Sequence, residues 1–241
     1  MSVPTFTVTL RPVTPIFMGG ATPANVWRMK NVAKPGEKPR WERDAQLESG
    51  MAELRPASLK GLLRSWYRAI DPEYRRHEAA IFGGAGPGQG QAPFTITLRF
   101  PVRGSEAWER NRYDGPPPQG FRQRAGDLWK NGVSYVGFPL ETRDTRERVE
   151  RRRVALPAGG TYEVVHHLSR RALDDGRVPK ALCAAWWLLC HVGGLGARCR
   201  RGFGSVTLVR WDPAEILPAG VPPLPSSARS VRTGGPRSRR A

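Results

Sequence analysis

Alternating apolar and polar residues predict most of the strands in this chain. The alternation is clearest over residues 94–102, and it recurs over residues 5–11 and 161–168. A period of two places one row of side chains on a core and the other row on the opposite face, as in a half-buried strand. An apolar segment over residues 205–211 predicts a fourth strand.

Other segments have the spacing of helices. Residues 58–70 begin at Ser58, a favourable N-cap, and carry a leucine-rich apolar face. Residues 179–192 are apolar on almost every side, which predicts a buried helix that begins at Pro179, where the missing N–H does no harm. A shorter helix is predicted within residues 72–82.

Along the chain, the main elements follow the order strand, helix, strand, strand, helix, strand. This order predicts an α+β fold with a ferredoxin-like βαββαβ core, the order that RNA-recognition modules also use. We expect residues 1–211 to form one domain, with both main helices on one face of its sheet. Insertions interrupt this domain at residues 21–54 and 103–160.

The insertions show no sustained period and are rich in proline and glycine. Residues 21–54 are therefore expected to be a long loop or a partly ordered insertion. In the second insertion, residues 133–139 predict a short strand, and residues 143–153, with six arginines, predict a mobile basic arm or the tip of a hairpin. Residues 212–241 are rich in proline and arginine, which predicts a disordered tail.

The charge of the chain points to a partner. Lysine and arginine together number 39 against 21 acidic residues, a net charge of +18, and 33 of the 39 are arginines. Arginine matches phosphate oxygens with a planar fork and stacks on bases, so nucleic acid is the leading partner. No apolar run approaches the roughly 20 residues that span a bilayer, which argues against a membrane partner. Three cysteines without C-x-x-C spacing suggest a cytoplasmic location and no thiolate zinc site.

The strongest candidate site is the glycine-rich loop between the buried helix and the last strand. Two Gly-x-Gly pairs flank a segment with three arginines and no acidic residue. Glycine lets another chain approach the backbone N–H groups, so we predict that this loop binds a phosphodiester backbone. The alternative is a flexible connector with solvated arginines. The residues concerned are Gly194, Gly196, Arg198, Arg200, Arg201, Gly202, Phe203 and Gly204.

The first predicted helix carries a second candidate surface. Lys60, Arg64 and Arg68 are spaced four residues apart, so they stack on one helical face. No carboxylate lies between Arg55 and Ile70 to neutralise this cationic stripe. A contact with RNA is therefore favoured over a solvated cationic face.

These motifs resemble the RAMP superfamily of CRISPR RNA-binding proteins. The loop spacing, Gly-h-Gly, five residues that include arginine, then Gly-h-Gly with h apolar, is similar to the C-terminal glycine-rich loop of that superfamily. Three further segments resemble the first RAMP subunit of the Cmr complex, the type III-B CRISPR effector. They are residues 14–20, 58–69 and 81–84.

The resemblance implies a subunit that holds the 3′ portion of a guide RNA, helps to engage target RNA in antiviral defence, and sits beside other RAMP subunits. It implies a binding role without slicing activity, and we expect no metal and no cofactor. Carried over by position, it places RNA contacts at Gly19 and Gly20, at Lys60, Arg64 and Arg68, and along the loop at residues 194–204.

A metal-independent RAMP endoribonuclease that processes the guide precursor is the alternative. Such an enzyme uses a histidine as general acid or base. A metal site is disfavoured because the chain has no H-E-x-x-H motif and no clustered aspartate pair, although Asp44 is available within residues 21–54. The candidate histidines are His77, His166, His167 and His191, and we favour the non-enzymatic role.

Overall fold

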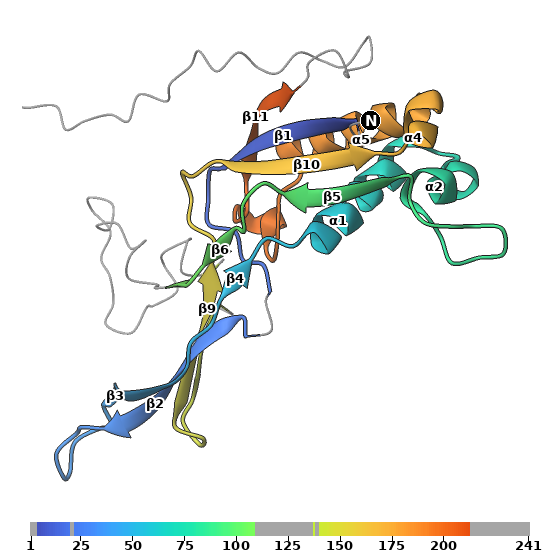
Figure 1. Cartoon of the computed structure of the whole chain (residues 1–241). Helices are drawn as coiled ribbons and strands as arrows, with labels where there is room; N and C mark the ends of the chain where they lie inside the picture. The colour runs from blue at the N-terminus through green and yellow to red at the C-terminus, as the bar shows by residue number, and fades with distance from the viewer. Residues whose placement is uncertain (1–3, 20–21, 109–136, 138–139, 213–241) are drawn as a thin grey trace, which may run out of the picture.

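The protein has a mixed α+β fold in which antiparallel sheets carry most of the strands (Figure 1). The computed structural model describes residues 4–19, 22–108, 137 and 140–212. The strands are β1 (Thr5–Pro12), β2 (Ala24–Asn31), β3 (Trp41–Glu48), β4 (Ala52–Glu53), β5 (Phe94–Leu98), β6 (Arg103–Gly104), β7 (Glu106–Ala107), β8 (Glu141–Asp144), β9 (Val149–Ala155), β10 (Tyr162–Leu168) and β11 (Val206–Asp212). The helices are α1 (Pro56–Ile70), α2 (Tyr74–Phe82), α4 (Arg170–Asp174) and α5 (Arg177–His191), with a 3-10 turn η3 (Cys199–Arg201).

The first sheet has the strand order β11-β1-β10-β5, and all of its pairs are antiparallel. The predicted alternation sets its inner face, since Phe6, Val8 and Leu10 of β1 are all 0% exposed. β5 ends at Leu98, four residues before the predicted end of this strand. The chain leaves the sheet there because the carbonyl of Val102 accepts a hydrogen bond from Leu54 and leads into the β4–β6 pair.

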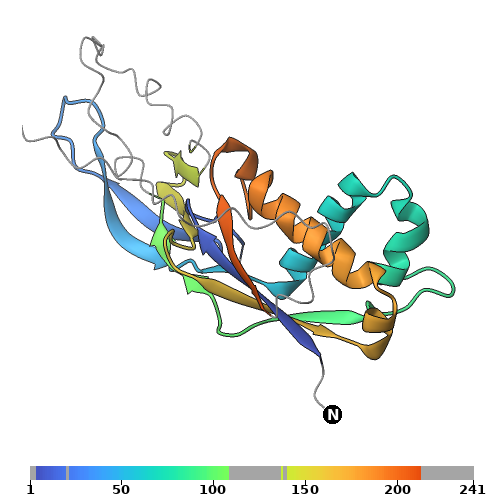
Figure 2. The same cartoon turned by 90° about the horizontal axis from the view of Figure 1, so that it is seen from above.

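The two main helices cover one face of this sheet, as predicted (Figure 2). α1 contacts both α5 and α2. Their apolar faces meet β1, β10 and β5 in a single core. The predicted N-cap Ser58 is wrong, because α1 begins slightly earlier, with Arg55 as the N-cap and Pro56 in the first turn, where proline is well tolerated.

A second sheet projects away from the first one (Figure 1). Its order is β3-β2-β9-β7, with β8 also paired to β9; we call β2, β3, β8 and β9 the finger. Of the two alternatives predicted for residues 21–54, the long loop is wrong, because β2 and β3 form an antiparallel hairpin within this insertion.

The sequence pattern did not predict β2 and β3, and the reason is physical. Seven of the eight residues of β3 are exposed, so no apolar row marks this strand. β2 contains register shifts at Val26/Trp27 and at Arg28/Met29, and each shift breaks a period of two. The hydrogen-bond ladder holds these strands together without an alternating pattern.

The second insertion is partly described. The hairpin predicted over residues 143–153 is present as β8 and β9, and β9 pairs with β2 on its other edge. The short strands β6 and β7 lie where irregular chain was predicted. The strand predicted over residues 133–139 lies outside the described residues apart from Gly137, and the tail lies outside them apart from Asp212. None of the described helices is long and apolar enough to cross a membrane.

Candidate nucleic-acid interface

The glycine-rich loop connects α5 to β11, and its backbone is tightly folded. Gly196, Gly202 and Gly204 have φ angles of 82°, 88° and 67°, and Arg198 is also left-handed at 63°. A Cβ atom on Gly204 would lie 1.8 Å from the carbonyl oxygen of Leu195, and one on Gly196 would lie 2.6 Å from that of Phe17. At these two positions glycine is required by close approach of the protein's own backbone.

The base of the loop is fixed to the segment that follows β1. Ala197 N–H donates to the Phe17 carbonyl at 2.8 Å, and Gly204 N–H donates to the Pro15 carbonyl at 2.9 Å. Leu195 is 0% exposed, and Phe203 packs edge-on against Phe17 with ring centroids 5.3 Å apart. The side chain of Phe203 therefore belongs to the interior, and its predicted contact with RNA has no exposed ring to support it.

The tip of the loop has the opposite character. Ala197, Arg200, Arg201 and Gly202 are exposed, whereas Arg198 is half-buried. Within the described part of the chain, neither Arg200 nor Arg201 takes part in an ion pair. The structure thus presents two neighbouring guanidinium groups on a turn whose base is anchored in the core.

The segment before the first insertion lies beside this loop. Phe17 and Ala197 form an isolated β-bridge, so Gly19 follows two residues after the contact. A Cβ atom on Gly19 would meet nothing within 4 Å, and its surroundings are open. Gly20 lies outside the described residues.

Two of the three cations in the stripe of α1 are paired with a carboxylate of α2. Glu78 is 6% exposed and accepts hydrogen bonds from Arg68 at 2.7 Å and from Arg64. Arg64 also donates to the Gly83 carbonyl at 2.9 Å. Hydrogen bonds from Arg68 lower the pKa of Glu78. Burial opposes this shift, and the hydrogen bond and charge of Arg64 lower the pKa further. The neutralising carboxylate that the sequence of α1 lacks is supplied by the next helix.

The loop and the stripe meet different sides of α1. A Cβ atom on Gly193 would lie 2.5 Å from the Trp66 ring, so the loop begins against that side chain. At 100° per residue, Trp66 is about 160° around the helix from Arg64. The structure therefore brings Trp66 to the loop and directs Arg64 towards α2.

Lys60 is the member of the stripe without a carboxylate partner in the described chain. Its Nζ lies 5.5 Å from the centroid of the Phe94 ring. Partial burial, and then the charge of Arg64, lower the pKa of Lys60. It stays a candidate for an RNA contact on geometric grounds.

A model of the RAMP superfamily matches residues 9–207. The chain belongs to the RAMP superfamily. The match includes α1 and the whole glycine-rich loop, so the two candidate surfaces of this RAMP protein lie within it.

Three solved structures are similar to this chain over most of its length. One is a chain of a type IV-B CRISPR complex, with 13% identity, coverage of 86% of this chain and 90% of that chain, and a TM-score of 0.41. Oligomeric Cmr4 from Pyrococcus furiosus has 12% identity, coverage of 86% and 99%, and a TM-score of 0.38. A chain of the type III-B Cmr-beta complex bound to cognate target RNA has 12% identity, coverage of 86% and 54%, and a TM-score of 0.43. These likenesses are distant, and no curated protein matches the chain.

Two of the candidate histidines of this RAMP protein have structural contacts. His166 is 0% exposed, stacks on Phe6 at 4.2 Å, and accepts a hydrogen bond from Trp186 Nε1 at 3.0 Å. Burial lowers the pKa of His166 to about 3, so it is neutral and closed off from a substrate. His191 stacks on Trp187 at 4.3 Å.

His77 and His167 are half-buried, whereas His191 is exposed. His167 lies on the helix-free face of the first sheet, with Nε2 2.8 Å from Thr97 Oγ1. His77 Nδ1 lies 3.1 Å from Asp71 Oδ2, which also accepts a hydrogen bond from Tyr67. Asp44 forms an ion pair with Lys30 at 3.3 Å, and the described residues contain no group of three or more metal-binding side chains.

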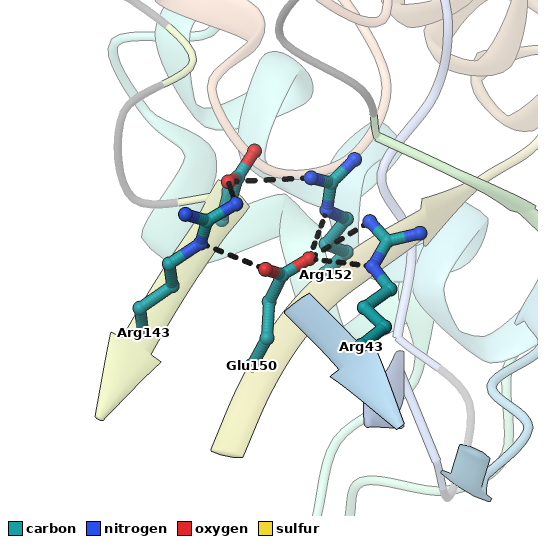
Figure 3. Close-up of polar contacts among 5 residues, drawn as sticks. Arg43, Arg143, Glu150 and Arg152 are labelled. Atoms are coloured by element: carbon teal, nitrogen blue, oxygen red, sulfur yellow. Dashed lines mark hydrogen bonds and ion pairs between the residues drawn. The ribbon is translucent and has the colours of Figure 1, made fainter. Parts of the chain in front are cut away.

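The sequence analysis missed a cluster of charges on the finger, which we call the Glu150 cluster (Figure 3). Glu150 is 0% exposed and binds three arginines from three strands. Only the number of arginines near residue 150 marked this region, and nothing marked Glu150 as buried or Arg43 as its partner. The cluster consists of Arg43, Glu141, Arg143, Glu150 and Arg152.

Proposed function

We propose that this RAMP protein is an RNA-binding subunit of a CRISPR RNA-guided effector complex. The observation that carries the proposal is the loop tip, where Arg200 and Arg201 are exposed on a turn held by the core. A fixed turn loses little conformational freedom when a ligand arrives, and paired guanidinium forks suit phosphate oxygens. The net charge of +18 adds a long-range attraction for RNA.

We also infer that the first sheet and its helices form a ferredoxin-like core. The strand order β11-β1-β10-β5 places the first and third of the four core strands in the centre, and both main helices lie on one face. This arrangement supports the βαββαβ assignment made from the order of elements. The glycine-rich loop then lies at the junction of the second helix and the last strand.

The finer part of the proposal rests on the sequence resemblance. The segments at residues 14–20, 58–69 and 81–84 favour a type III-B Cmr complex and a place near the 3′ portion of the guide RNA. In this role the protein contacts guide and target RNA and sits beside other RAMP subunits. Binding, not cleavage, is the proposed activity.

Binding to single-stranded RNA at several salt concentrations tests the proposal. About five phosphate contacts predict a slope near −3.5 for log affinity against log salt. Replacing Arg200 and Arg201 by glutamine removes two charge-assisted contacts and is expected to weaken binding about tenfold, with the melting temperature unchanged.

The matched control is the exposed pair Arg170 and Arg171 on α4, replaced in the same way. This control variant loses as much net charge as the loop-tip variant. If the loop tip contacts the RNA, the control is expected to weaken RNA binding by less than about twofold. Equal losses in the two variants, or a salt slope near zero, contradict the loop assignment.

One observation favours the endoribonuclease as a second candidate. Asp71 orients His77 through Nδ1 and leaves the other ring nitrogen available, as in an acid–base pair. Incubation of the unmodified chain with repeat-containing RNA separates the two roles. Intact RNA supports the binding role, whereas a single cut that is lost in His77→Ala supports the nuclease.

A further inference from the structure

The Glu150 cluster joins three strands of the finger through one buried carboxylate. Glu150 Oε1 accepts hydrogen bonds from Arg43 Nε and Nη2 at 2.9 and 2.8 Å and from Arg152 Nε at 2.7 Å. Glu150 Oε2 accepts one from Arg143 Nε at 2.7 Å. Figure 3 shows the three guanidinium groups converging on this carboxylate from β3, β8 and β9.

Glu150 accepts hydrogen bonds from more arginines than one carboxylate needs as partners. Three arginines face two glutamates, since Glu141 lies 3.6 Å from Arg143 and 3.4 Å from Arg152. A single bidentate arginine is enough to pair one buried carboxylate. Buried ion pairs also contribute little stability compared with apolar side chains of the same size, so stability alone does not explain the arrangement.

The carboxylate instead fixes the direction of the arginines. Burial opposes ionisation of Glu150, but the hydrogen bond from Arg43 and the three arginine charges together lower the pKa of this carboxyl. Arg43 is further held over the Trp27 ring, 4.1 Å from its centroid. Arg43 and Arg143 therefore lose side-chain freedom when the protein folds, before any ligand is present.

Two of the arginines reach the surface. The side chain of Arg143 is 52% exposed and that of Arg43 is 33% exposed, whereas that of Arg152 is 12% exposed. Each of the two exposed arginines uses Nε and Nη2 in the cluster. Nη1 of neither arginine takes part in a hydrogen bond or ion pair within the described chain, so one edge of each guanidinium remains for a ligand.

We propose that Arg43 and Arg143 form a second phosphate-binding site on the finger, oriented by Glu150, and that it holds a phosphodiester group of bound RNA. The inference rests on the proposed function, since its ligand is the RNA. The site is separate from the glycine-rich loop, and it joins β8 and β9, where a basic arm or the tip of a hairpin was predicted, to β3, where a loop or a partly ordered insertion was predicted. Glu150 acts here as a positioning residue.

Binding of a fluorescein-labelled, mixed-sequence single-stranded RNA to the full chain tests this site. Arg143→Gln is expected to weaken binding about five- to tenfold and to reduce the magnitude of the salt slope by about 0.7. Arg143→Lys keeps the charge but loses the fork, and it is expected to stay within about twofold of Arg143→Gln. The matched control is Arg151→Gln on the opposite face of β9, with an expected effect below about twofold.

Glu150→Gln distinguishes an effect of arginine orientation from an effect of net charge. The substitution raises the net charge by one, so an affinity that depended on charge alone would rise, whereas loss of orientation is expected to weaken binding about threefold or more. A melting curve accompanies each variant, and Arg143→Gln decides the matter where Glu150→Gln fails to fold.

The outcomes separate the two proposals. Equal losses for Arg143→Gln and Arg151→Gln overturn the finger site in favour of diffuse charge. No loss for Arg143→Gln beside a clear loss for the loop-tip variant overturns the finger site alone. An unmodified chain that does not bind RNA overturns both.

Discussion

The helical layer and the tip of the glycine-rich loop use similar polar groups in opposite ways. In the helical layer, Arg64 and Arg68 donate to Glu78, and Trp186 of α5 donates to His166 of β10 in the core beneath. At the tip, Arg200 and Arg201 are exposed and have no ion pair in the described chain. A row of cations in a sequence therefore shows where charge lies, but only the fold shows whether its partner is the same chain.

The glycines of the loop divide in the same way. Gly204 lies in the base, where the Leu195 carbonyl leaves no room for a side chain. Gly202 lies at the tip, and a Cβ atom there would meet nothing within 4 Å. One glycine serves internal packing, and the other serves only the turn of the chain.

The largest expected effect follows from this difference. Gly204→Ala combines a φ of 67° with a backbone clash, and we expect it to lower the free energy of unfolding by about 3 kcal/mol or more. Gly202→Ala, with a φ of 88° and open space, is the control and is expected to cost about 1 kcal/mol. Urea denaturation of both variants measures the difference. Equal costs would show that the base is no more tightly packed than the tip.

Acid pH probes the buried side of the comparison. The pKa of His166 is about 3 in the folded state and 6.5 without burial, so the unfolded chain takes up a proton first as pH falls. Stability should then decline between pH 6.5 and 4.5, by about 2.5 kcal/mol from this group alone. Glu78 and Glu150 reduce stability only below this pH window, because the pKa of each carboxyl is lowered from 4.5 in the folded state.

His166→Gln is the matched variant for that measurement. Its amide oxygen can accept the hydrogen bond from Trp186 but does not titrate. Urea denaturation at several pH values should give a flatter profile between pH 6.5 and 4.5 for the variant. An unchanged slope would mean that His166 is not held neutral in the core.

The smallest expected effect concerns the cationic stripe. Glu78→Gln leaves Arg64 and Arg68 without their carboxylate, and we expect a loss of about 2 kcal/mol, reduced by solvent screening of the half-exposed arginines. Glu73→Gln removes a carboxylate from an exposed pair with Arg76 and is expected to change stability by less than about 0.5 kcal/mol. RNA affinity is measured alongside. A rise of more than about threefold in Glu78→Gln alone would show that the stripe competes for RNA and would break the contrast with the loop tip.

Local patterns were sufficient where one face of an element is buried. The alternation in β1 and the apolar face of α1 follow directly from contact with a single core, so both elements form close to their predicted limits. β3 lacks such a face because it is exposed along almost its whole length, and its pairing with β2 is a matter of backbone hydrogen bonds. An alternating pattern cannot predict a strand that is exposed to solvent on both faces.

The candidate site was predictable to the same extent. The spacing of the glycines predicted the loop, because positive φ angles at Gly196, Gly202 and Gly204 are marked by the residue type itself, and of the three arginines between them Arg200 and Arg201 are exposed. Phe203 was assigned to the same surface, yet its ring packs between Phe17 and Trp108. Sequence spacing gave its position in the loop but not the direction of its side chain.

The sequence alone determined the order of the core elements and the place of the glycine-rich turn, since both follow from patterns within a few residues. The surplus of arginine follows from composition. Tertiary structure decided which cations are already paired. Glu78 reaches Arg64 from the next helix, and Glu150 reaches Arg43 across 107 positions of the chain. Electrostatic partners are set by distance in space, which the chain fixes only when its sheets and helices pack.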